Sequence, residues 1–134
     1  MQSKITTADK TEVVIDEPEA LGGTNTGGGP LDYLAAAMQS ALHSTLMEVA
    51  KEKEITVSSV EWSVGLGIDL EGLMGVKDAV IPPQSFEVTA SVAMEDQDQK
   101  ALDALGKQVE DRCDFYNLWK DAGLKMNITY TLKQ

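Results

Sequence analysis

Residues 30–52, PLDYLAAAMQSALHSTLMEVAKE, are the stretch that decides the fold. Apolar side chains recur through it at the spacing of an α-helix, and the opposite side is also mostly small or apolar. A helix that is apolar most of the way round is buried between layers of a protein rather than lying on its surface. We therefore predict a long central helix that begins at Pro30, since proline is well tolerated in the first helical position.

Alternation of apolar and polar residues predicts strands around this helix. Three runs have clear period-two patterns and a fourth is shorter; they are residues 60–69, 86–94, 124–132 and 11–15. The first two are joined by a long connection over residues 71–84, and such connections are often functional. A second helix over residues 101–109, capped by Asp96 or Asp98, and a short one over residues 115–121, ended by Gly123, complete the pattern.

This order of elements predicts an α+β fold with mostly antiparallel pairing, in a single domain over residues 1–134. Four clear strands are too few to cover a long helix that is apolar on two sides. We therefore expect a homodimer in which the second chain completes the core.

Composition excludes several classes of function. The chain has 134 residues, 43% of them hydrophobic, and a net charge of −11, so nucleic acid and anionic membrane surfaces would repel it. No apolar run approaches the roughly 18 uninterrupted residues of a membrane-spanning helix. One cysteine and one histidine do not make a zinc cluster, and we expect no metal or cofactor. The lone cysteine and the lack of a secretory signal pattern favour the cytoplasm.

Two local patterns have weak functional interpretations. The glycine-rich segment 21–29 precedes a helix and could cradle a phosphate, but it lacks the Lys-Ser/Thr pair of a P-loop, which favours a connector that permits close packing. His43 and Ser44 are adjacent in the central helix and cannot face each other as a nucleophile and base would. We expect His43 to form a hydrogen bond across the dimer interface instead.

Several motifs together resemble the OsmC/Ohr family. They are Asp16-Glu17-Pro18, then ALGGTNTG at residues 20–27, PLDYLAAA at residues 30–37, and the Arg112-Cys113 pair. The resemblance implies an OsmC-like fold: an intertwined homodimer with two long central helices wrapped by sheets from both chains and active sites at the interface. It also implies thiol peroxidase chemistry on organic hydroperoxides. In that chemistry a peroxidatic cysteine on the central helix attacks, a resolving cysteine closes a disulfide, and a glutamate and an arginine activate the thiolate.

This chain departs from that pattern at the residues that carry the chemistry. Counted from Pro30, the peroxidatic position of the family holds Ala41, and the position of the helix-start glutamate holds Leu31. The family arginine lies on an early strand, whereas the only arginine here is Arg112. Cys113 matches the resolving cysteine, and Asp114 follows it where the family usually has proline.

These departures predict a degenerate, non-peroxidase homodimer that keeps a small-molecule pocket at its interface. The expected pocket residues are Met38, Ala41, Leu42 and Thr45, with Cys113 and Tyr116 opposite, and the expected occupant is a small apolar molecule or an organic hydroperoxide. The alternative is a hydroperoxide peroxidase of the oxidative stress response that acts through Cys113, and a third is a purely structural remnant. We expect Cys113 to react poorly, because partial burial and the flanking Asp111 and Asp114 oppose a thiolate.

Overall fold

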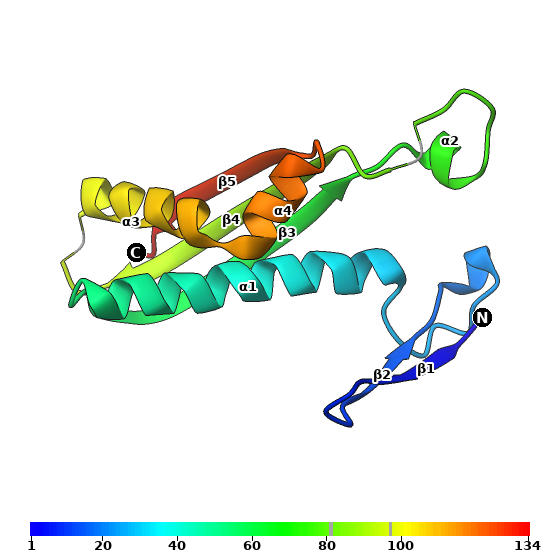
Figure 1. Ribbon diagram of the computed structural model, residues 1–134, viewed down its shortest axis with the longest axis horizontal. Helices are drawn as coiled ribbons and strands as arrows, with labels where there is room; N and C mark the ends of the chain where they lie inside the picture. Colours follow the sequence, from blue (N-terminus) through cyan, green and yellow to red (C-terminus); the bar gives the residue numbers. More distant parts are fainter. Residues whose placement is uncertain (81, 97) are drawn as a thin grey trace. The chain divides into compact units, whose positions relative to one another are not determined.

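The computed structural model describes residues 1–80, 82–96 and 98–134, which form two compact units, residues 1–36 and 37–134 (Figure 1). Helix α1, Pro30–Glu52, begins in the first unit and continues into the second. Its bounds coincide with the predicted central helix. Ile81, in the predicted connection over residues 71–84, lies outside the described residues.

The first unit contains a two-stranded antiparallel sheet of β1, Ser3–Thr6, and β2, Glu12–Ile15, followed by the 3-10 turn η1, Glu19–Leu21. Strand β2 corresponds to the predicted short strand over residues 11–15. Strand β1 is not predicted, because all four of its residues are exposed and their sequence has no alternating apolar pattern. It is recognised only through its pairing with β2.

A buried carboxylate organises the loop between β2 and α1. Asp16 is 1% exposed, and its Oδ2 accepts hydrogen bonds from the backbone N–H and the hydroxyl of Thr24, at 3.1 and 2.6 Å. The same oxygen accepts the corresponding pair from Thr26, at 3.1 and 2.7 Å. These bonds favour the charged carboxylate and hold the pKa of Asp16 well below its usual range. The Asp-Glu-Pro and Thr-Asn-Thr motifs are therefore two halves of one hydrogen-bonded structure.

Two glycines in this loop are required by close backbone approach. A Cβ at Gly23 would clash with the carbonyl oxygen of Glu17, and one at Gly27 would lie 2.6 Å from the carbonyl oxygen of Val14. The loop thus packs closely against the backbone of β2 and of the residues that follow it. Only a residue without a side chain fits at these two positions.

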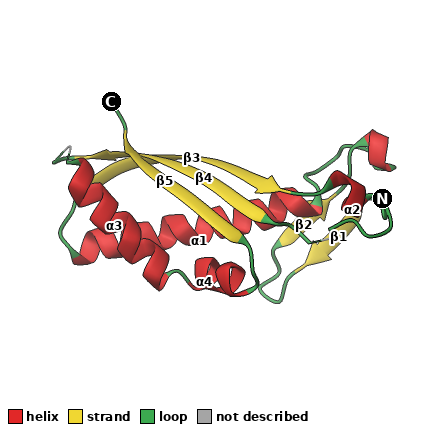
Figure 2. Cartoon of the chain, turned by 90° about the horizontal axis from the view of Figure 1, so that it is seen from above, coloured by secondary structure: helices red, strands yellow, loops and turns green. Residues whose placement is uncertain are grey.

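The second unit is a three-stranded sheet with helices on one face (Figure 2). Its strands, in the order β3-β4-β5, are Val57–Gly67, Ser85–Met94 and Lys125–Leu132. The part of α1 in this unit covers the sheet together with α3, Gln99–Arg112, and α4, Asp114–Asp121, while the short α2, Leu70–Leu73, lies in the β3–β4 connection.

The predicted α+β fold is confirmed, with one difference in strand direction. Strands β3 and β4 are antiparallel as expected, whereas β4 and β5 are parallel. The two helices α3 and α4 lie between β4 and β5, and this crossover returns the chain so that β5 runs in the same direction as β4.

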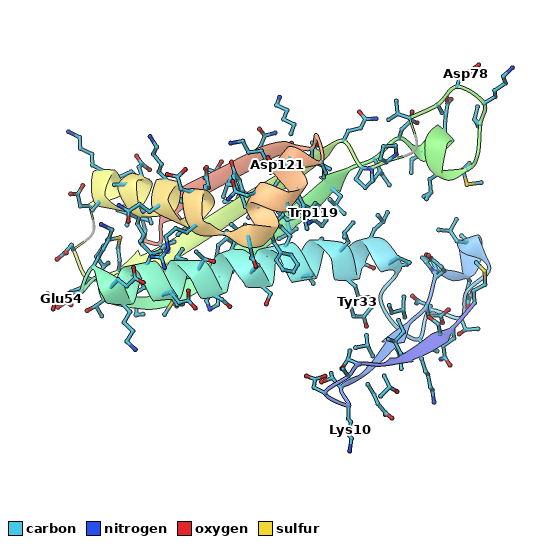
Figure 3. All side chains as sticks on the ribbon, viewed as in Figure 1. Lys10, Tyr33, Glu54, Asp78, Trp119 and Asp121 are labelled. Carbon is cyan, nitrogen blue, oxygen red and sulfur yellow. The ribbon has the colours of Figure 1, made fainter. Side chains whose placement is uncertain are left out.

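The core of this unit lies between the sheet and the helices. Every second residue of β4 is buried, and the rows that face it come from α1 and α3; these residues are Phe86, Val88, Ala90, Val92, Met94, Met38, Leu42, Leu46, Val49, Leu102, Leu105 and Val109. Trp119 of α4, labelled in Figure 3, packs edge-on against Phe86, and the ring centroids are 5.7 Å apart. On the other side of α1, Ala37, Ser40, Ser44 and Met47 are exposed, so one chain buries α1 on one face only.

The side chain of Gln99 occupies the outer edge of β5. Its amide nitrogen donates to the carbonyl oxygen of Tyr130 at 2.9 Å, and its amide oxygen accepts from the N–H of Leu132 at 3.3 Å. An amide side chain thereby takes the place of a further strand and satisfies backbone groups that an edge would otherwise leave open to another chain.

The Asp16 carboxylate should make the loop between β2 and α1 acid-resistant. Because its pKa is lowered by folding, its stabilising contribution is complete above the unfolded value of about 3.9 and is lost as the pH falls below that value. We expect the amide NMR resonances of Thr24 and Thr26 to stay constant as the pH falls through about 4, because Asp16 of the folded protein is still ionised where a free aspartate takes up a proton. Asp16→Asn should displace them at every pH, whereas the exposed control Glu19→Gln should not. Unchanged resonances in Asp16→Asn would contradict this account.

Candidate functional site

The four α1 residues predicted to line a pocket lie on one side of the helix, at the spacing i, i+3, i+4 and i+7. Met38 and Leu42 are fully buried, and Ala41 and Thr45 are half-buried beside them. The hydroxyl of Thr45 donates to the carbonyl oxygen of Ala41 at 2.9 Å. It is thus engaged by its own helix, and this side of α1 presents no reactive group.

Cys113 lies at the junction of α3 and α4, where it ends one helix and begins the next. Its side chain is 0% exposed, and its N–H donates to the carbonyl oxygen of Val109 at 2.8 Å. The side-chain amide of Asn117 donates to the carbonyl oxygens of Cys113 and Glu110, both at 2.9 Å, and so clamps the junction. A thiol buried in this way resembles a core residue more than an exposed nucleophile.

Arg112, which could favour a Cys113 thiolate, instead forms an ion pair with the end of α1. Its guanidinium donates to both carboxylate oxygens of Glu52, at 2.5 and 3.1 Å. This contact raises the pKa of Arg112 and lowers that of Glu52. The pair is exposed and joins residues 60 positions apart, so its role is to tie α3 to α1.

Helices α3 and α4 also carry a half-buried acid and a half-buried phenol on either side of Cys113 in the sequence. The hydroxyl of Tyr116 donates to Glu110 Oε2 at 3.3 Å, and burial raises the pKa of both groups. Tyr130 of β5 is 8% exposed, and its hydroxyl has no hydrogen-bond partner within the described part of the chain. Its ring lies over Gly106 of α3, where a Cβ would clash with it.

Sequence reasoning includes Tyr116 in the site but misses Glu110 and Tyr130. Tyr130 is predicted only as one apolar position of a strand. The available signal is that a tyrosine on the buried side of a strand must place its hydroxyl in the core, where it needs a partner.

His43 is paired within the chain. The indole Nε1 of Trp62 donates to His43 Nδ1 at 3.1 Å, and the rings are edge-on with centroids 6.1 Å apart. This geometry identifies Nδ1 as the acceptor nitrogen, which leaves Nε2 to carry the proton. Nδ1 of His43 is therefore engaged by β3 of the same chain, and the predicted hydrogen bond of His43 across a dimer interface stays a prediction.

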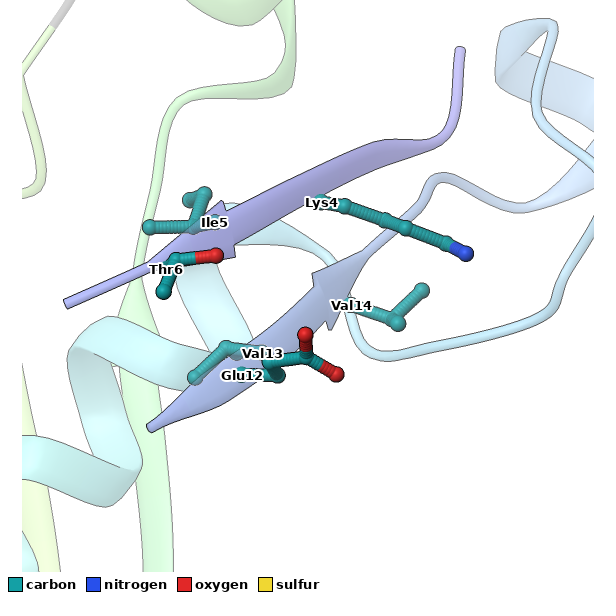
Figure 4. Close-up of a pocket in the computed structure, with 6 residues that line it drawn as sticks. All are labelled: Lys4, Ile5, Thr6, Glu12, Val13 and Val14. Atoms are coloured by element: carbon teal, nitrogen blue, oxygen red, sulfur yellow. The ribbon is translucent and has the colours of Figure 1, made fainter. Parts of the chain in front are cut away.

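A small pocket of about 190 Å³ lies on the β1–β2 sheet (Figure 4). It is lined by Lys4, Ile5, Thr6, Glu12, Val13 and Val14, and contains none of the predicted site residues. Its volume is below the roughly 300 Å³ at which most small-molecule sites begin. In the described ranges no group of histidine, cysteine and acidic residues could hold a metal ion. No described helix is both long enough and apolar enough to span a membrane.

Comparison with known proteins identifies the family. The family model described as "OsmC-like protein" matches residues 23–129, so the chain belongs to the OsmC-like family. The match begins within the glycine loop and ends in β5, and thus includes the whole of α1 and the α3–α4 junction. No curated protein matches the sequence.

Solved structures share the fold over almost the whole chain. An OsmC-like protein from Mycoplasma pneumoniae is 17% identical with a TM-score of 0.79, covering 100% of this chain and 96% of its own. The organic hydroperoxide resistance protein OhrB of Bacillus subtilis is 24% identical with a TM-score of 0.63, covering 97% and 89%. An organic hydroperoxide resistance protein from Legionella pneumophila is 15% identical with a TM-score of 0.69, covering 98% and 88%.

Proposed function

We propose that this chain is a homodimeric OsmC-like protein that has lost two-cysteine peroxidase chemistry and binds a small apolar molecule. The observation that carries the proposal is that its 134 residues contain a single cysteine, Cys113, which is buried. A peroxidase that closes a disulfide needs a second thiol within reach of the first. The family's peroxidatic position holds Ala41, and a methyl group has no lone pair with which to attack a peroxide.

The side chains of the proposed pocket favour a neutral ligand. Met38, Ala41, Leu42, Thr45, Cys113 and Tyr116 include no acid or base that is charged near neutral pH, and most of their surface is apolar. The chain as a whole has a net charge of −11, which opposes an anionic ligand. A small molecule held mainly by apolar contacts matches these side chains best.

Three exposed features support a second copy of the chain as the partner. The outer face of α1 presents small or apolar residues, including Met47, which is 40% exposed. Strand β3 forms an open edge of its sheet, whereas the opposite edge is occupied by Gln99. The β1–β2 hairpin is a two-stranded sheet, and such hairpins are marginally stable alone. A second chain that covers α1 and adds strands would satisfy all three.

The dimer should depend on the exposed face of α1. We expect light scattering at micromolar concentration to give the mass of two chains, and Met47→Lys to shift the protein toward monomer because it places a charge in an apolar contact. Ala104→Lys, on an exposed position of α3, adds the same charge outside this face and should leave the mass unchanged. A well-folded wild-type monomer would contradict the intertwined arrangement.

A peroxidase assay with an organic hydroperoxide tests whether the chain has lost the peroxidase activity. With cumene hydroperoxide and excess dithiothreitol, we expect the wild type to consume peroxide no faster than Cys113→Ser does. Both rates should remain at the protein-free background, because no disulfide can form within the chain. Appreciable consumption by the wild type that is lost in Cys113→Ser would instead establish the alternative, a one-cysteine peroxidase.

Placing a cysteine at position 41 tests whether this position lies close to Cys113, as the family resemblance implies. We expect Ala41→Cys to form a disulfide with Cys113 under a mild oxidant, which requires Cα atoms within about 7 Å. Ser40→Cys is the matched control, since it lies about 100° away round the helix and should keep its thiol free. Turnover should stay low even in Ala41→Cys, because no arginine occupies an early strand. Free thiols in oxidised Ala41→Cys would show that the positional match is wrong.

A further inference from the structure

Within the described part of the chain, one side-chain hydrogen bond joins helix α1 to strand β3. The indole Nε1 of Trp62 donates it to Nδ1 of His43 at 3.1 Å. Apolar packing holds β3 less firmly than its neighbour, because no residue of β3 is fully buried whereas every second residue of β4 is. Strand β3 is also an open edge of its sheet. This one bond is therefore a substantial part of what holds β3 against α1.

The bond depends on a lone pair that a proton would also use. A neutral imidazole has one N–H and one nitrogen with a free lone pair, and here the lone pair on Nδ1 accepts the indole N–H. A second proton can be added only at Nδ1. In the resulting imidazolium both nitrogens are donors, so N–H groups of His43 and Trp62 would point at each other. The bond can therefore exist only while His43 is neutral.

The surroundings of His43 supply no negative charge that would compensate for the loss of this bond. Its polar and ring contacts within residues 1–80, 82–96 and 98–134 are with Trp62, and no acid in these ranges forms an ion pair with it. The residues one turn away on α1, those that flank Trp62 on the same face of β3, and the residue opposite Trp62 on β4 are all uncharged; they are Gln39, Ser40, Leu46, Met47, Val60, Val64 and Ala90. Glu48, the acid of α1 nearest in sequence, lies about 140° away round the helix. Glu61 lies on the opposite face of β3 and forms an ion pair with Lys133.

We propose that His43 and Trp62 form a pH-sensitive latch between α1 and β3, closed while His43 is neutral and opened when Nδ1 takes up a proton from water. The His43 ring is half-buried, so water can reach it. Histidine is the side chain whose ordinary titration falls between about pH 5 and 8, and His43 is the only histidine of the chain. The stabilising contribution of the bond is present at the upper end of this range and is lost as the pH falls through it.

Opening of the latch loosens the edge strand β3 from α1. The latch lies within one chain, so it does not depend on the proposed dimer or on the proposed ligand.

NMR spectroscopy of the full chain follows the proton and the bond in one titration. The Hε1 resonance of the single histidine reports protonation, and the indole N–H resonance of Trp62 reports the bond. The indole of Trp119, which packs on Phe86, is an internal control. Between pH 8 and pH 5 we expect the His43 and Trp62 resonances to shift with the same midpoint, while that of Trp119 stays constant.

The matched variant for this titration is His43→Gln. Its amide oxygen can accept the indole N–H but does not titrate, so the Trp62 resonance should stay constant over the same range. A Trp62 resonance that stays in place in the wild type while His43 is protonated would overturn the proposal. A His43 that remains neutral down to pH 5 would overturn it as well, because the latch would then never open.

Unfolding by denaturant separates a latch from a bond that is only structural. Between pH 8 and pH 5 we expect the unfolding equilibrium constant of the wild type to rise about fivefold more than that of His43→Gln, the effect of losing one hydrogen bond. Trp62→Phe, which removes the donor, should lose this additional pH dependence too. Trp119→Phe, which removes the other tryptophan, should keep the pH dependence of the wild type. Equal changes in the wild type and in Trp62→Phe between the two pH values would contradict the latch.

Discussion

Packing of one apolar row of α1 against the sheet is the interaction on which the second unit depends. Met38, Leu42, Leu46 and Val49 are all fully buried. Burial of one such side chain stabilises a protein by roughly 1.5–3 kcal/mol. Four of them together are comparable with the whole net stability of a small domain, about 5–15 kcal/mol. Ala41 stands beside this row at a half-buried position, so the identity of the side chain there can change without removing the contacts that fix α1 on the sheet.

The first unit explains why a family motif can be informative about fold independently of activity. Asp16, Thr24 and Thr26 satisfy one another's hydrogen bonds, and Gly23 and Gly27 permit close backbone contacts. None of these interactions involves a thiol. The segment that most strongly indicates the family is thus maintained by local folding requirements, and it remains informative about fold while saying little about activity.

Sequence predicts most of this fold and only part of the site. Helix α1 and strands β3–β5 are located correctly, because each buries one face and its apolar residues therefore recur at a regular helical or strand spacing. The exposed strand β1 and the parallel β4–β5 pairing escape prediction, because each depends on a partner distant in sequence. The site differs for the same reason: the Arg112–Glu52 ion pair, the Trp62–His43 hydrogen bond and the unpaired Tyr130 hydroxyl are products of tertiary packing. The dimer and the ligand pocket remain predictions.

The central claim is that the chain keeps the OsmC-like fold but uses the pocket at its dimer interface to bind a small apolar molecule rather than to reduce organic hydroperoxides. Native mass spectrometry of the purified wild-type chain tests it most directly. The account predicts the mass of two chains plus a small, neutral, noncovalent adduct that is released as collision energy rises and that is reduced in a variant such as Ala41→Phe, which fills the proposed pocket. A bare polypeptide mass under gentle conditions, together with no uptake of added apolar compounds by the dimer, would contradict it.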